Sequence, residues 1–246
     1  MSKQMLNEQT FTAANIERVG ASGDRTMSVN GVIARTLVLF AVTVVFGVIG
    51  WTRAEGVLTA SPLLVIGGFA ALIGLSIAAA RNPRLAAPAG FAYAVIMGVW
   101  AGAISRVYNE QYSGIVLQAV LATGSVFLAM LFLYVTRIVR VTKKMAGIII
   151  AATMGIALLY LVSLVLSLFG AQPSFLTDSS PLGILLSIGI CIVASLNLLL
   201  DFSFIEQGVA AGAPAAYEWY GAFALLSTLV WLYLEILRLL ARLQSR

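Results

Sequence analysis

Two acidic residues, Asp201 and Glu235, lie inside long apolar runs of the chain. Asp201 follows three leucines and the apolar pattern continues past it to about Gly208, while Glu235 lies within the run of residues 231–237. An ionisable side chain at membrane depth is costly and therefore marks a candidate functional site. Two carboxyl groups in one poorly hydrated site cannot both ionise cheaply, so they share a proton and respond to pH. With both groups ionised, the pair offers the oxygen ligands that Ca²⁺ prefers.

Each of these two acids also has a structural interpretation. Asp201 could end a helix among the lipid headgroups, and Glu235 could pair with Arg238, three residues further along the same helix. Arg238 could instead extend to the membrane interface and leave Glu235 without this partner. Asn197 lies one helical turn before Asp201 and shares its face, which makes it a secondary candidate.

Further charged residues border the apolar runs. Arg81 and Arg84 flank a proline and are the nearest candidates, on the same side, to neutralise Asp201. Both could equally be ordinary anchors at the membrane interface. Glu206 and Glu218 lie in the connection between the last two runs. Glu206 could form an inner gate, but solvated positions are the preferred interpretation for both.

Composition excludes several kinds of chemistry. Of the 246 residues, 61% are hydrophobic and only 10% are charged, against roughly 25% in a soluble domain, so the sequence indicates a membrane protein. There is no histidine and one cysteine, Cys191, which leaves no intrachain disulfide, Cys/His zinc site or catalytic Ser-His pair. Intramembrane aspartyl chemistry needs two positioned aspartates, and only Asp201 lies at membrane depth. We therefore expect neither enzymatic activity nor a cofactor.

The apolar runs predict an all-α, polytopic membrane protein with seven spans. A helix needs about 20 apolar residues to cross the hydrocarbon core, and its backbone hydrogen bonds must be satisfied internally. The predicted spans are residues 36–52, 57–80, 85–105, 114–136, 146–169, 182–200 or further, and 219–240. Residues 1–30 form a polar tail for which we expect disorder, and residues 31–246 form the membrane domain.

The two carboxyl groups can meet only under one condition. With a turn at residues 212–214, Asp201 lies about 16 Å before the turn and Glu235 about 31 Å after it along straight helices. They reach the same depth only if residues 213–223 do not cross the membrane, and the last span then begins nearer Ala224. Aromatic residues that settle at the interface favour this arrangement. They are Tyr217, Trp219 and Tyr220.

The distribution of Lys and Arg predicts the orientation. With the N-terminus inside, the inner side carries ten basic residues and the outer side five. The basic C-terminus argues the other way, because six spans would place both ends inside. We expect a multi-pass protein of the cytoplasmic membrane with a cytoplasmic N-terminus. Anionic lipid headgroups, rather than nucleic acid, explain the net charge of +5.

The last two runs resemble the Bax inhibitor family, the transmembrane BAX-inhibitor-motif proteins. The matching segments are residues 199–202 (Leu-Leu-Asp-Phe), residues 231–240 around Glu235, and the passage from Arg81 to Gly98. The hydropathy pattern agrees over residues 30–240, and the composition resembles that of a bacterial, actinobacterial type of member.

The resemblance implies a seven-helix bundle with the last helix at its centre. It also implies that carboxylates from the sixth and seventh helices act as a pH sensor for a Ca²⁺ leak. By motif match Asp201 and Glu235 would be this pair, and Arg81 would bond to it in the closed state. Glu235 departs from the more familiar aspartate by one methylene, and the connection between the last two helices is longer than in compact members.

Two functions from different classes follow. The first is a pH-sensitive leak of cations, favouring Ca²⁺, in which deprotonation of Asp201 and Glu235 adds repulsion and favours opening. A proton-coupled carrier is a rival within transport, although its inverted repeats are not evident. The alternative is a membrane interaction protein that modulates a protease or a stress response without transport, with the polar tail binding a partner of unknown identity.

Overall fold

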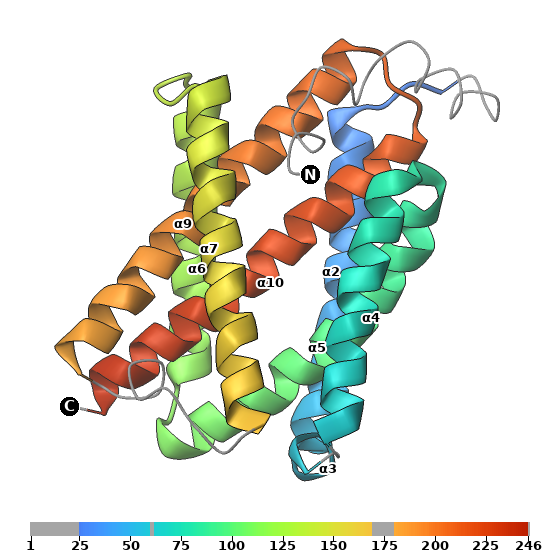
Figure 1. Cartoon of the computed structure of the whole chain (residues 1–246). Coiled ribbons are helices and arrows are strands. Elements are labelled where there is room, and N and C mark those ends of the chain that lie inside the picture. The colour runs from blue at the N-terminus through green and yellow to red at the C-terminus, as the bar shows by residue number, and fades with distance from the viewer. Residues whose placement is uncertain (1–24, 60–61, 169–179, 246) are drawn as a thin grey trace. The chain divides into compact units, whose positions relative to one another are not determined.

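The computed structural model describes residues 25–59, 62–168 and 180–245, and the elements in these ranges are helices (Figure 1). They are α2 (Val29–Thr52), α3 (Ala54–Leu58), α4 (Pro62–Arg81), the 3-10 helix η2 (Pro83–Leu85), α5 (Ala86–Gln111), α6 (Ile115–Val135), α7 (Lys143–Leu168), α9 (Pro181–Ala210) and α10 (Ala216–Gln244). The predicted all-α fold is confirmed.

Six of these helices, α2, α5, α6, α7, α9 and α10, are long and apolar enough to cross a membrane. The remaining long helix, α4, corresponds to the predicted span 57–80 and has 20 residues. Within it, the described part contains a shorter apolar stretch, Ala70–Ala79. The multi-pass character is therefore confirmed, whereas the count of seven spans is not. Half of the apolar window of α10 is buried, the largest share among the six spans.

The predicted turn between the last two spans is present, but the last helix starts earlier than expected. Gly212 has a φ of 62°, a left-handed conformation that glycine adopts without strain. α10 begins at Ala216, before the predicted span 219–240, and a crossing of the membrane that starts nearer Ala224 stays a prediction. The Tyr217 amide donates to the Pro214 carbonyl at 3.0 Å, and Glu218 in the first turn complements the helix dipole.

The residues just before α2 are ordered and packed. Thr26 forms a β-bridge with Pro214, and the Met27 amide donates to the Ala213 carbonyl at 2.7 Å. The Met27 side chain is buried. Thr26 and Met27, near the end of the expected tail, therefore bind the turn between α9 and α10. Residues 1–24 lie outside the described part of the chain.

Internal packing divides the chain into two compact units. Unit 1 comprises the chain up to Val107 together with Asp201–Val230, and unit 2 comprises Tyr108–Leu200 together with the chain from Trp231 onwards. The long helices α9 and α10 each contribute a segment to both units.

In unit 1, glycines allow α2 and α5 to pack at close range. A Cβ atom at Gly102 would collide with the backbone of Gly47, and one at Gly98 would lie 2.6 Å from the Thr43 carbonyl oxygen. The spacing of these two α5 glycines is the small-residue pattern that brings membrane helices together. Backbone contact between α2 and α5 is thus the core of this unit.

Aromatic side chains attach the first half of α10 to the same unit. The rings of Tyr93 on α5 and Phe223 on α10 meet edge to face, with centroids 5.2 Å apart. The rings of Phe204 on α9 and Tyr220 on α10 lie 5.0 Å apart. Such pairs contribute about 0.5–1.5 kcal/mol beyond their buried area, so they hold α10 against both α5 and α9.

In unit 2, hydrogen bonds between side chains and backbone connect the helices. Arg242 on α10 is buried and donates to the Gly183 carbonyl oxygen at 2.5 Å and to the Ser187 hydroxyl at 2.6 Å, both on α9. The Gln244 amide donates to Gln118 on α6 at 3.1 Å. These bonds position the last turns of α10.

We expect Gly102→Ala to destabilise the protein, because the added methyl group collides with the α2 backbone. Overpacking of this kind costs about 1–3 kcal/mol. The measurement is the midpoint of thermal unfolding in detergent micelles. Gly124→Ala on α6 is the matched control, because a Cβ atom there meets nothing within 4 Å. A midpoint for Gly102→Ala at or above that of the control would contradict the close packing of α2 and α5.

Candidate functional site

The Asp201 carboxyl group belongs to α9, in the segment of this helix that lies in unit 1. Phe202 beside it is buried, and the Thr228 side chain of α10 interacts with the carboxyl group. The second carboxyl oxygen, Oδ2, is buried without a hydrogen-bond partner among the described residues. Because α9 continues to Ala210, Asp201 does not end the helix.

Glu235 lies in a closed polar network of unit 2. Its side chain is 2% exposed, and Arg238 Nη1 lies 3.0 Å from its Oε2. The Tyr160 hydroxyl of α7 donates to Oε1 at 2.7 Å, and the Trp231 indole N–H donates to the same oxygen at 3.2 Å. Arg238 Nη1 also donates to the Tyr160 hydroxyl oxygen at 2.6 Å. The pairing of Glu235 with Arg238, one of the two interpretations of this residue, is the one observed.

This network gives the Glu235 carboxylate a counter-ion, Arg238, and two further donors. A buried ion pair is stable only when further hydrogen bonds satisfy its remaining lone pairs, and Tyr160 and Trp231 provide them. Sequence reasoning did not identify Tyr160 as part of this site. The residue lies on another helix, 75 positions before Glu235, so local spacing contains no signal for the contact.

The two carboxyl groups belong to different compact units, Asp201 to unit 1 and Glu235 to unit 2. Their meeting stays a prediction. Among residues 25–59, 62–168 and 180–245, no three histidine, cysteine or acidic side chains gather, and a Ca²⁺ site at Asp201 and Glu235 likewise stays a prediction.

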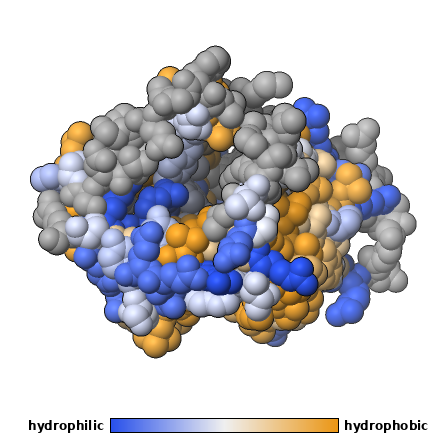
Figure 2. Space-filling model, turned by 90° about the horizontal axis from the view of Figure 1, so that it is seen from below, coloured by the Kyte–Doolittle hydropathy of each residue, from blue (hydrophilic) through white to orange (hydrophobic). Residues whose placement is uncertain are grey.

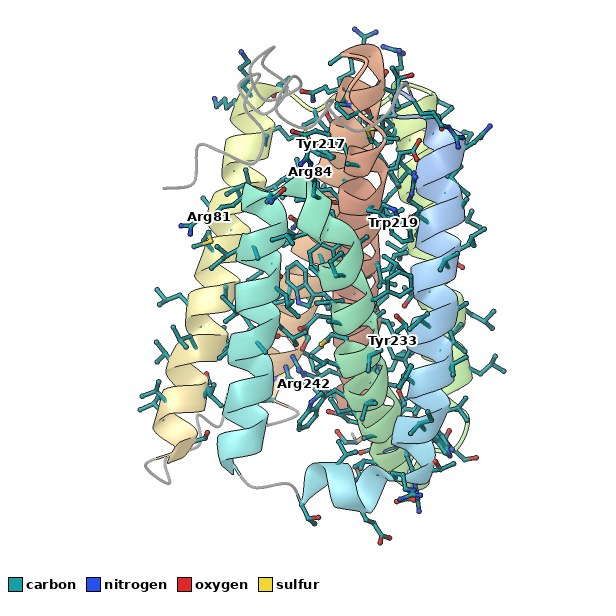
Figure 3. All side chains as sticks on the ribbon, turned by 90° about the vertical axis from the view of Figure 1, so that its right-hand side faces the viewer. Arg81, Arg84, Tyr217, Trp219, Tyr233 and Arg242 are labelled. Atoms are coloured by element: carbon teal, nitrogen blue, oxygen red, sulfur yellow. The ribbon has the colours of Figure 1, made fainter. Side chains whose placement is uncertain are left out.

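The two arginines predicted to neutralise Asp201 lie at one end of α4 (Figure 3). Arg81 is the last residue of α4, Arg84 belongs to η2, and both are exposed. Within the described part of unit 1, the Asp201 carboxyl group contacts Thr228 rather than either arginine. Their role as closed-state partners stays a prediction.

The secondary candidates on α9 have different surroundings. Asn197 donates through Nδ2 to the Thr153 hydroxyl on α7 at 2.8 Å and to the Val193 carbonyl at 2.8 Å. It therefore links two helices of unit 2. Glu206 is exposed, as its solvated interpretation requires.

Glu218 was expected to be solvated, and this expectation is wrong because the side chain is 5% exposed. Its Oε1 accepts hydrogen bonds from the backbone amide of Ser28 at 2.8 Å and from the Ser28 hydroxyl at 3.0 Å. Its Oε2 forms an ion pair with Arg35, whose guanidinium carbon lies 5.2 Å from the centre of the Trp219 ring. The carboxylate thus connects the start of α2 to the first turn of α10.

Comparison with known protein families gives a match over nearly the whole chain. The family model described as Bax inhibitor 1 like matches residues 3–245. Comparison with curated proteins gave no match, and comparison with solved structures also gave none.

We expect Glu218→Gln to lower the free energy of unfolding by about 2–4 kcal/mol. Removing one member of a buried ion pair leaves the other charge without its partner, and only a quarter of the Arg35 side chain is exposed to water. The thermal unfolding midpoint in detergent reports the loss. Glu206→Gln, at an exposed acid of α9, is the control and should match the wild type. Equal midpoints for both variants would show that the contact does not stabilise the fold.

Proposed function

The chain belongs to the Bax inhibitor 1-like family, and on this premise we propose that it is a pH-sensitive leak channel for cations in the cytoplasmic membrane, with Ca²⁺ as the favoured ion. The observation that carries the proposal is the Asp201 carboxyl group. It lies inside a helix of membrane-spanning length, and its buried Oδ2 has no hydrogen-bond partner in the described part of the chain.

A buried carboxylate needs donors or a cation to replace the water that it has lost. The Thr228 hydroxyl supplies one such partner for Asp201. Two species can satisfy the remaining oxygen, namely a proton, which makes the group neutral, or a hard cation, which binds carboxylate oxygen directly. Competition between a proton and a cation for the same oxygen makes occupancy of the site depend on pH.

Opening would follow from the same chemistry. The interaction between Thr228 and Asp201 connects α10 to α9 within unit 1. With Asp201 protonated, no uncompensated charge opposes this contact. Deprotonation places a negative charge in an apolar setting with few donors, which favours entry of water and of a cation between the helices. Glu235 would contribute as the second carboxyl group of the mechanism, restrained by Arg238.

The interaction-protein alternative also has one observation in its favour. The residues directly before α2 are bound to the turn at Ala213 and Pro214. A partner that binds residues 1–24 would therefore be connected, through this contact, to the start of α10. This regulator needs no ion flux, and the tail would be its essential segment.

We expect Ca²⁺ entry into liposomes that contain the protein to rise from about pH 5 to pH 8, as carboxyl groups deprotonate. Asp201→Asn, which imitates the protonated acid, should keep the flux low throughout this range. Glu235→Gln should change the pH profile and also reduce stability, because it leaves Arg238 without its counter-ion. A dye trapped inside the vesicles measures the entry of Ca²⁺.

The matched control for these variants is Glu110→Gln, at an exposed acid near the end of α5. Its pH profile should follow that of the wild type. Flux equal to that of empty liposomes at every pH would refute the leak and favour the interaction protein. Flux that neither Asp201→Asn nor Glu235→Gln alters would refute these carboxyl groups as the sensor.

Deleting residues 2–24 separates the two functions. The deletion retains the segment that binds the turn before α10, so the membrane part should fold, and a leak should keep its flux to within about twofold. A regulator that acts through the tail should lose its effect on cells. Loss of flux in the deletion variant would contradict a leak formed by the helices alone.

A further inference from the structure

A pocket of about 450 Å³ lies at the end of α2, within unit 1. Pockets of this size accommodate small ligands. Its charged lining consists of two arginines and one glutamate. The lining residues are Thr52, Arg53, Glu55, Gly56, Val57 and Arg106.

The two arginines come from segments that are distant in the sequence. Arg53 connects α2 to α3 and is exposed. Arg106 of α5 donates through Nη1 to the Trp51 carbonyl oxygen at 3.2 Å, one of the last carbonyls of α2, which have no partner within the helix. This bond holds the Arg106 guanidinium at the end of α2. The fold therefore brings together the only basic residues of two segments, 53–61 and 98–114.

The charges of the pocket match those of a phosphate ester that carries an amine. Guanidinium groups present a planar fork of donors that suits phosphate oxygens. Glu55, in the first turn of α3 and exposed, offers a carboxylate to a positively charged amine. A pocket for a simple anion would gain nothing from Glu55, whereas a zwitterionic ligand uses both signs of charge.

The surroundings of the pocket indicate a membrane lipid rather than a dissolved ligand. The last turns of α2 before the pocket expose Val45, Val48 and Ile49, whose side chains are 58%, 60% and 44% accessible. In a helix of membrane-spanning length, such residues contact acyl chains. Figure 3 shows α3 lying across the end of α2, and Figure 2, viewed from that end, shows hydrophilic side chains gathered on the face.

We propose that this pocket binds the headgroup of phosphatidylethanolamine, with its phosphate against Arg53 and Arg106, its amine against Glu55, and its acyl chains along the exposed face of α2. The lipid would join the end of α2 to the end of α5 through their arginines. Binding of the lipid at this site does not depend on ion flux. A result that refutes the proposed leak would therefore leave the lipid site unaffected, and a result that refutes the site would leave the leak unaffected.

The test is a lipid titration of the full-length, delipidated protein in detergent, followed by native mass spectrometry. We expect phosphatidylethanolamine to bind more tightly than phosphatidylglycerol. Arg53→Gln should weaken the binding of phosphatidylethanolamine about tenfold, because it removes one charge-assisted contact. Glu55→Gln should remove the preference between the two lipids, since it leaves the phosphate contacts in place.

Arg53→Gln is the deciding variant because Arg106 also binds the end of α2 and its loss would affect folding. Arg140→Gln, at an exposed arginine between α6 and α7, is the control for general charge effects and should bind as the wild type does. Equal affinity of Arg53→Gln and the wild type would overturn the site. Equal binding of both lipids by the wild type would overturn the role of Glu55. Displacement of the lipid by millimolar inorganic phosphate would identify a free-anion site instead.

Discussion

Inside the hydrocarbon layer no water replaces a missing hydrogen bond, so each polar group must find its partner within the protein. The placement of charges in this chain follows from that constraint. Glu235 on α10 has Arg238 together with the hydroxyl of Tyr160, and Glu218 at the start of α10 has Arg35. Both acids belong to the last helix, the most buried span, so its position depends on contacts to α7 in one unit and to α2 in the other.

The sequence was sufficient to predict the helices and their approximate extent. Hydropathy reports how far a segment can remain in lipid, and it located both ends of α6 and α7 to within a few residues. The helices α5 and α9 begin where predicted, but α5 continues to Gln111, beyond the predicted end at residue 105, and α9 continues past residue 200 to Ala210. Hydropathy predicted one continuous span over residues 57–80, whereas α3 ends at Leu58 and α4 begins at Pro62. The hydropathy pattern therefore predicts which residues lie in the membrane more reliably than it predicts the number of spans.

The start of α10 shows why the site was harder to predict than the fold. Aromatic residues were interpreted as interface anchors, but Trp219 packs against Phe91 and lies beside Arg35. Glu218 was interpreted as solvated, although an acid in the first turn of a helix was a usable signal for a helix start at this point. Its partner is Arg35, far away in the sequence. Contacts of this kind depend on which helix faces meet. The local spacing of residues in one sequence does not show which faces these are.

The two membrane acids illustrate how surroundings, rather than residue type, determine function. Glu235 has a counter-ion and two further donors, so its negative charge is already compensated. Asp201 has the Thr228 hydroxyl and a buried oxygen without a partner in the described part of the chain. Protonation or cation binding changes the energy of Asp201 more directly than that of Glu235. A pH response of this membrane domain should therefore begin at α9 and involve the Glu235 network as the element that holds α10 in place.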